Sequence, residues 1–146
     1  QEYAASTVLA AYSCMNPGVT KTAAQWGGLV RSAYPAYTGP RPAVSVWHGT
    51  ADATVVPRNA AESVKQWTDA LGADQSADGT EALPGGTTRT DYTGPDGSVA
   101  VRSYLVQGMG HGTPVRPGEG CGVAGAHFLD AICSSRYIAR DWGLTG

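Results

Sequence analysis

The chain contains 146 residues, which corresponds to one domain of the usual ~100–200 residues. Hydrophobic residues make up 42% of it and charged residues 15%, so disorder is not expected. The net charge is −2 and the basic residues are scattered singly, which excludes a row of phosphate contacts and makes nucleic acid an unexpected partner. Apolar runs are far shorter than the ~20 residues that span a bilayer, so no membrane segment is expected.

The first predicted helix starts near Thr20 and ends before Pro35. Thr22 and Gln25 have the spacing of a capping box at its start. Three prolines and a glycine then fill residues 34–42, a composition typical of an extended connector.

Residues 43–47, Ala-Val-Ser-Val-Trp, are predicted to form a buried strand, because the run is short, β-branched and aromatic and ends near Gly49. An amphipathic helix is predicted after the following loop. Asn59 and Glu62 have cap spacing at its start, apolar side chains recur along one stripe, and Gly72 has the position of a C-cap.

Residues 74–97 are polar and rich in glycine, aspartate and threonine, which predicts a surface excursion with one outer strand at 87–92. The apolar residues of 99–106 predict the next strand. Two strands that flank a helix form a βαβ unit with a right-handed crossover.

The tail from Val123 onward is predicted to be helical, because Ala124, Phe128 and Ile132 recur at intervals of four. The fold class expected from these elements is α/β, with a mostly parallel sheet and flanking helices.

Two loops carry the residues with catalytic potential. Residues 47–52, Trp-His-Gly-Thr-Ala-Asp, and residues 108–112, Gly-Met-Gly-His-Gly, each follow a predicted strand, where open α/β sheets place their ligand-binding groups. An aspartate after one strand and a histidine after the next is the order in which α/β-hydrolases supply the acid and base of a Ser-His-Asp system. Asp52 and His111 are therefore the candidate catalytic residues, with Asp52 orienting the ring of His111.

Simpler interpretations exist for each residue taken alone. Asp52 can cap its own turn, and His111 between two glycines can be an exposed turn histidine. Their joint occurrence, each just past a strand, favours catalysis. His48 is expected to make structural hydrogen bonds near the site, and His127 is expected on a helix face.

The candidate substrate-pocket residues are Trp47, His48 and Met109, although Trp47 also fits a core position. Neither Cys-x-x-Cys nor His-x-x-x-His spacing occurs, so no metal or other cofactor is expected. Residues 74–79 resemble the first half of a calcium loop, but Gly85 stands where that loop needs a glutamate.

Cys121 and Cys133 lie twelve residues apart and are predicted to form a disulfide worth ~3 kcal/mol; the alternative is two buried thiols in a cytosolic domain. Cys14 is left over, which indicates a partner outside this sequence. The composition, with few lysines and many glycines, threonines and serines, is that of an extracellular, secreted protein. Residues 1–3 show no signal-peptide pattern, so Gln1 looks like a cut end.

The nucleophile of a Ser-His-Asp system is not evident. An α/β-hydrolase carries it on a Gly-x-Ser-x-Gly elbow before the acid, and no serine here has glycines at both flanking positions. The serines before Asp52 are Ser6, Ser13, Ser32 and Ser45, and none is predicted to lie on a strand-to-helix elbow.

Several motifs along the chain resemble those of the secreted esterases related to poly(3-hydroxybutyrate) depolymerases, a group that includes feruloyl and acetylxylan esterases. In chain order, the motifs lie at residues 11–18, 25–27, 47–52, 55–57, 66–68, 108–112 and 142–144. The resemblance implies an α/β-hydrolase fold, secretion, no metal, and ester hydrolysis through an acyl-enzyme. By motif, Asp52 matches the acid and His111 the base. Residues 1–146 then look like the carboxy-terminal part of the catalytic domain, with the nucleophile-bearing half preceding Gln1.

The first hypothesis is thus that this chain is the acid- and base-bearing part of an ester hydrolase with a polymeric substrate. The enzyme would be active only when the upstream half is present. The open sheet edge left by such a division predicts binding to that half or self-association. An alternative is a non-catalytic polymer- or protein-binding domain that presents Trp26, Trp67 and Trp142, although their helical stripes favour burial. A third hypothesis is a different class of enzyme, in which Asp52 and His111 act with a serine from an unexpected place, such as Ser6.

Overall fold

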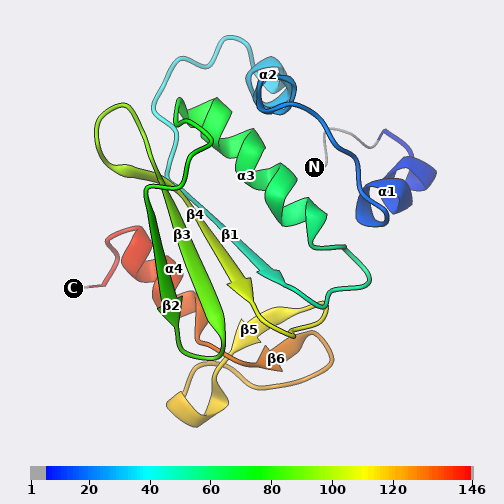
Figure 1. Cartoon of the computed structure of the whole chain (residues 1–146), viewed down its shortest axis with the longest axis vertical. Helices are drawn as coiled ribbons and strands as arrows, with labels where there is room; N and C mark the ends of the chain where they lie inside the picture. The colour runs from blue at the N-terminus through cyan, green and yellow to red at the C-terminus, as the bar shows by residue number, and fades with distance from the viewer. Residues whose placement is uncertain (1–5, 146) are drawn as a thin grey trace.

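The computed structural model describes residues 6–145, and Figure 1 shows their arrangement around a central sheet. The helices are α1 (Val8–Met15), α2 (Ala23–Ala33), α3 (Arg58–Leu71) and α4 (Ser134–Asp141), with a 3₁₀ turn at Pro117–Glu119. The strands are β1 (Val44–Gly49), β2 (Gly79–Leu83), β3 (Thr87–Thr93), β4 (Val99–Val106), β5 (Thr113–Val115) and β6 (Phe128–Asp130). No helix among the described residues is long and apolar enough to cross a membrane.

The predicted βαβ unit is present. Strands β1 and β4 pair in parallel, from Val44 opposite Val101 to Gly49 opposite Val106, and the chain between them forms α3 and then β2 and β3. Parallel strands end at the same edge of a sheet, so the loops that follow β1 and β4 emerge side by side (Figure 1).

The mixed α/β class is confirmed, but the sheet is less parallel than expected. Its order is β1-β4-β3-β2, and β3 pairs antiparallel with both β4 and β2. The expected surface excursion is in fact the hairpin of β2 and β3, which turns at Gly85 and Gly86, both with positive φ. Glycines with positive φ suit the tight turn of a hairpin, so this polar segment can form two strands that extend the sheet.

Helix α3 covers one face of the sheet and α4 lies on the other (Figure 1). The hydroxyl groups of Ser45 on β1 and Tyr104 on β4 both donate to the Asp141 carboxylate of α4, at 2.9 and 2.8 Å. The rings of Trp47 and Tyr104 stack on this side with centroids 3.9 Å apart. Alternate side chains of each strand therefore bind α4, while those between them face α3.

The capping box predicted at Thr22 and Gln25 is confirmed at the start of α2. Helix α3 ends at Gly72 as predicted, with φ 75°. Its start differs, because Pro57 precedes Arg58 as the N-cap and the Asn59 side chain is used elsewhere.

The prediction of a helical tail from Val123 is wrong for its first half. The segment forms turns and the short strand β6, which pairs in parallel with β5, and only Ser134–Asp141 is helical. The Cys121–Cys133 disulfide is present and closes this segment into a loop. Phe128 is 51% exposed, so the fourfold spacing of apolar residues does not mark a buried helix face.

Candidate active site

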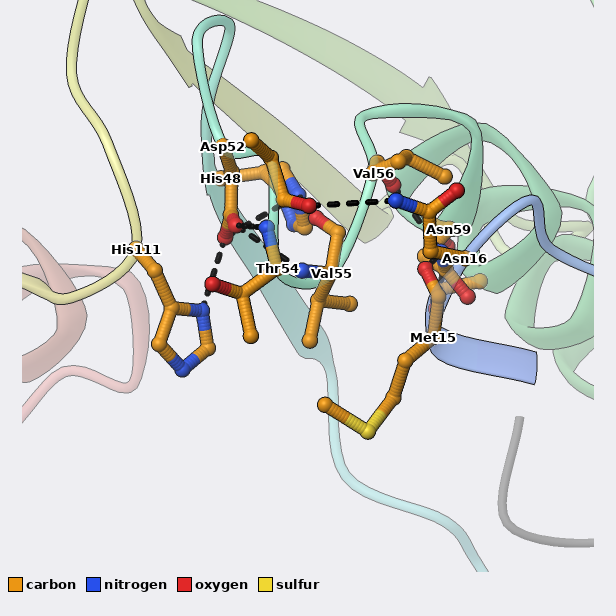
Figure 2. A network of polar contacts seen from close by, with 11 residues as sticks. Met15, Asn16, His48, Asp52, Thr54, Val55, Val56, Asn59 and His111 are labelled. Carbon is orange, nitrogen blue, oxygen red and sulfur yellow. Dashed lines mark hydrogen bonds and ion pairs between the residues drawn. The ribbon is translucent and has the colours of Figure 1, made fainter. Parts of the chain in front are cut away.

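The candidate acid and base are in direct contact. The Nδ1–H of His111 donates a hydrogen bond of 2.9 Å to Oδ2 of Asp52. Figure 2 shows the second ring nitrogen of His111, Nε2, turned away from the carboxylate. The side chain of Asp52 is 5% exposed and that of His111 is 46% exposed. A neutral ring that donates through Nδ1 has a free lone pair on Nε2, so the exposed edge of His111 can accept a proton.

The other carboxylate oxygen of Asp52 caps its own turn. Oδ1 accepts the backbone N–H groups of Thr54 and Val55, each at 2.9 Å. Burial by itself raises the pKa of Asp52, but the hydrogen bonds from His111 and from these two amides outweigh it, so the pKa lies below its ordinary value. One oxygen of Asp52 therefore caps the turn, and the other binds His111.

Backbone hydrogen bonds tie the loop after β4 to the loop after β1. The amide of Ala51 donates to the carbonyl oxygen of Met109 at 3.0 Å, and the amide of Gly108 donates to the Thr50 hydroxyl at 2.9 Å. Gly49 makes this approach possible, because a Cβ at that position would overlap the Met109 carbonyl. These contacts fix the position of His111 relative to Asp52.

His48 supports the same loop. Its Nε2–H donates to the Val55 carbonyl oxygen at 2.7 Å, and the same nitrogen lies 3.7 Å from Oδ2 of Asp52. This agrees with the expected structural role near the site. Because Nε2 of His48 carries the proton donated to Val55, this nitrogen is not free to accept one.

The end of α1 also holds the Asp52 loop, as Figure 2 shows. The carbonyl oxygen of Met15 accepts the backbone N–H of Val56 and the side-chain amide of Asn59, at 3.0 and 3.1 Å. The side-chain amide of Asn16 donates to the carbonyl oxygen of Ala53 at 3.1 Å. Residues distant in the chain thus brace the turn that carries the carboxylate.

A cavity of about 360 Å³ adjoins the pair; Trp47, His48, Asp52, Val55, His111 and His127 are among its lining residues. Trp47 and His48 thus line the same cavity as the candidate acid and base. Met109 is not among its lining residues: the residue is 7% exposed and packs with Val106 and Ile132.

His127 was expected on a helix face, and that expectation is wrong. It lies in the turn before β6 and lines the cavity, with its ring centroid 6.3 Å from that of His111. The sequence contains no spacing signal for this proximity, since it depends on the pairing of two three-residue strands.

The described residues show no serine bonded to His111. The hydroxyl groups of Ser13, Ser32 and Ser45 donate to Leu9, Leu29 and Asp141, and Ser6 is exposed at the start of the described chain. Within residues 6–145 there is also no group of three or more histidine, cysteine, aspartate or glutamate side chains that could hold a metal ion.

A platform of three tryptophans does not form. Trp26 is fully buried, and its indole N–H donates to Glu62 at 2.6 Å. Trp67 is half-buried and Trp142 is 52% exposed, so the first of the three proposed platform residues belongs to the interior.

The α/β fold, with the candidate acid and base at the ends of adjacent parallel strands, has the arrangement used by α/β-hydrolases. The chain is 46% identical over 146 residues to the poly(3-hydroxyalkanoate) depolymerase C of Paucimonas lemoignei, covering 97% of this chain and 35% of that protein. It is 40% identical over 97 residues to feruloyl esterase B of Neurospora crassa, covering 66% of this chain and 32% of that protein. No family model matches the chain.

The solved structure of an acetyl xylan esterase from Aspergillus awamori superposes with a TM-score of 0.60 at 26% identity, covering 74% of this chain and 39% of the esterase. The chain therefore belongs to the family of homologous ester hydrolases that includes these depolymerases and esterases. It spans about a third of the length of the curated relatives it matches.

Proposed function

We propose that this chain is the acid- and base-bearing part of a carboxylic ester hydrolase with a Ser-His-Asp mechanism. Its substrate is a polyester such as polyhydroxybutyrate, or a feruloyl or acetyl ester. The observation that carries the proposal is the 2.9 Å contact between Asp52 and His111, with the free ring edge turned away from the carboxylate beside the cavity. The homologous depolymerases and esterases support the same reaction class.

In this mechanism Nε2 of His111 accepts the proton of a serine hydroxyl as the serine oxygen attacks the ester carbonyl. Asp52 holds the ring in position through Nδ1 and stabilises the imidazolium that forms. The imidazolium then protonates the leaving alcohol, and an acyl-enzyme remains. His111 next takes a proton from a water molecule as the water oxygen attacks the acyl group. The imidazolium then returns that proton to the leaving serine oxygen, so the acid is released and both the serine and the neutral imidazole are restored.

The serine belongs, in this proposal, to an upstream segment of the same enzyme that packs beside β1. Strand β1 is at the end of the sheet order, and its side away from β4 has no partner strand among residues 6–145. An open edge is a template for a further strand. The upstream segment fills it, and a second copy of the chain fills it when that segment is absent.

The proposed location is extracellular, after secretion. The Cys121–Cys133 disulfide supports it, because such bonds persist mainly in oxidising compartments.

The test compares the chain alone with the chain joined to the part of the Paucimonas lemoignei relative that it does not match. The chain alone should hydrolyse 4-nitrophenyl butyrate at the background rate, because no serine within residues 6–145 is bonded to His111. The joined protein should be active, and His111→Ala should remove that activity by orders of magnitude, whereas Val123→Ala, on an exposed loop, should not. A rate well above background from the chain alone, unchanged by His111→Ala, contradicts the proposal.

A further inference from the structure

His127 is a second imidazole in the candidate site that the proposed mechanism does not use. Its ring lies edge-on to that of His111, at 77° and a centroid distance of 6.3 Å, and both residues line the same cavity. The residue is exposed, so its ring nitrogens are available to a ligand.

The backbone of His127 is held against the loop that carries His111. Its carbonyl oxygen accepts the N–H of Thr113 at 2.8 Å, and Thr113 pairs with Phe128 in the β5/β6 ladder. A Cβ at Gly112 would come within 2.9 Å of that same carbonyl oxygen, so the glycine next to His111 permits the approach. The second imidazole is thus presented from a fixed backbone, as positioning groups require.

The separation of the two rings matches a substrate with two oxygen functions. In a 3-hydroxyacyl polyester, successive ester groups are joined by four backbone bonds, or about 5 Å by the reach of an extended chain. If the scissile ester is placed beside Nε2 of His111, the oxygen of the neighbouring unit lies within reach of His127. A simple acetyl or butanoyl ester carries no such second oxygen.

We infer that His127 is a specificity-determining residue, which donates a ring N–H to the second oxygen of a hydroxyacyl ester and so favours hydroxyacyl chains over simple acyl esters. This inference rests on the proposed function. It adds a substrate-contacting group that acts outside the proton-transfer steps of Asp52 and His111.

The experiment measures ester binding to this chain by the imidazole C–H signals in NMR, which are few because the chain has 3 histidines. The probes are the methyl ester of the linear 3-hydroxybutyrate dimer and methyl butanoate. The chain alone is suited to this measurement because no serine within residues 6–145 is bonded to His111. His127→Phe removes the donor, His127→Gln keeps one, and Val123→Ala is the control in the same disulfide loop.

In the wild-type chain the dimer ester should shift the signals of both His111 and His127. In His127→Phe, the concentration of dimer ester that half-saturates the His111 shift should rise about five-fold, the effect of one neutral hydrogen bond. Binding of methyl butanoate should not change. His127→Gln should retain most of the preference for the dimer, and Val123→Ala should match the wild type.

The contrary outcomes are distinguishable. If His127→Phe binds both esters as the wild type does, or loses both equally, the assignment of His127 is overturned while the ester site at His111 stands. If neither ester moves the His111 signal of the wild-type chain, the proposed ester site fails, and the inference fails with it. Unchanged backbone amide spectra of the variants establish that they remain folded.

Discussion

The amide of Ala51 donates to the carbonyl oxygen of Met109 at 3.0 Å, and this bond joins the loop of the candidate acid to the loop of the candidate base. Gly49 lies beneath this junction, where a Cβ would overlap the Met109 carbonyl. The relative position of Asp52 and His111 therefore depends on backbone contacts as well as on the bond between their side chains.

Gly49→Ala should separate the two loops. Overpacking against backbone costs about 1–3 kcal/mol, and the Asp52 to His111 hydrogen bond should lengthen or break. Urea unfolding measures the cost, and the Nδ1–H resonance of His111 reports the bond. Gly28→Ala is the control, since nothing lies within 4 Å of a Cβ there and alanine favours the α2 helix. Equal stability of the two variants would contradict the prediction.

Asp52→Asn should change how stability depends on pH. The pKa of Asp52 is lowered in the folded chain, so its ionisation stabilises the fold above the ordinary aspartate pKa of about 3.9, and that contribution is lost as pH falls through the lower folded pKa. The difference in unfolding free energy between wild type and variant should thus be largest near neutral pH and shrink below about pH 4. Urea titrations from neutral to acidic pH test this, and a constant difference would refute it.

Glu62 joins α2 to α3 and should be important for stability. Its carboxylate, on a residue 3% exposed, accepts the indole N–H of Trp26 at 2.6 Å and binds Lys65 Nζ at 2.6 Å. Glu62→Ala should cost about 1–3 kcal/mol or more, because the buried indole N–H loses its acceptor. Tryptophan fluorescence during urea unfolding measures the loss.

The control for Glu62 is Glu81→Ala. Glu81 pairs with Arg89 at 3.0 Å, but its side chain is 53% exposed. Exposed ion pairs contribute about 0–1 kcal/mol, so this variant should remain close to the wild type. A loss at Glu81 as large as that at Glu62 would show that burial of the carboxylate is not the cause.

Replacing both Cys121 and Cys133 by serine should lower the free energy of unfolding by roughly 3 kcal/mol, the chain-entropy value for a short loop. The same change frees the segment that carries His127, so the His127 imidazole signal should narrow and shift toward that of an unstructured peptide. Thermal unfolding with and without reductant provides the comparison. If the reduced wild type were as stable as the oxidised one, the disulfide would not contribute to stability as predicted.

The open side of β1 should make the isolated chain self-associate. Light scattering should show a dimer whose population rises with concentration, and joining the chain to the unmatched part of its Paucimonas lemoignei relative should suppress it. A stable monomer at all concentrations, with cooperative melting, would count against pairing at this edge.

Elements with strong local patterns could be predicted from the sequence. Strand β1, the α2 capping box and the Gly72 end of α3 follow from side-chain period and cap chemistry, which act over a few residues. The contact between Asp52 and His111 follows from one topological rule, that parallel strands end at one edge.

The remaining features depend on contacts between distant segments. Strands β5 and β6 have three residues each, too few to show a period, and β6 lies within the loop that Cys121 and Cys133 close. The spacing of Ala124 and Phe128 therefore imitated a helix, and the place of His127 in the cavity could not be predicted. The apolar helix α1 was also missed, although its end braces the Asp52 loop through Asn16.

Every hydrogen bond described for the Asp52 carboxylate comes from this chain, from His111, Thr54 and Val55. In the proposed mechanism the carboxylate and the imidazole are therefore in contact before any nucleophile arrives. A serine would then need only to lie beside Nε2 of His111, because Asp52 already orients that ring through Nδ1.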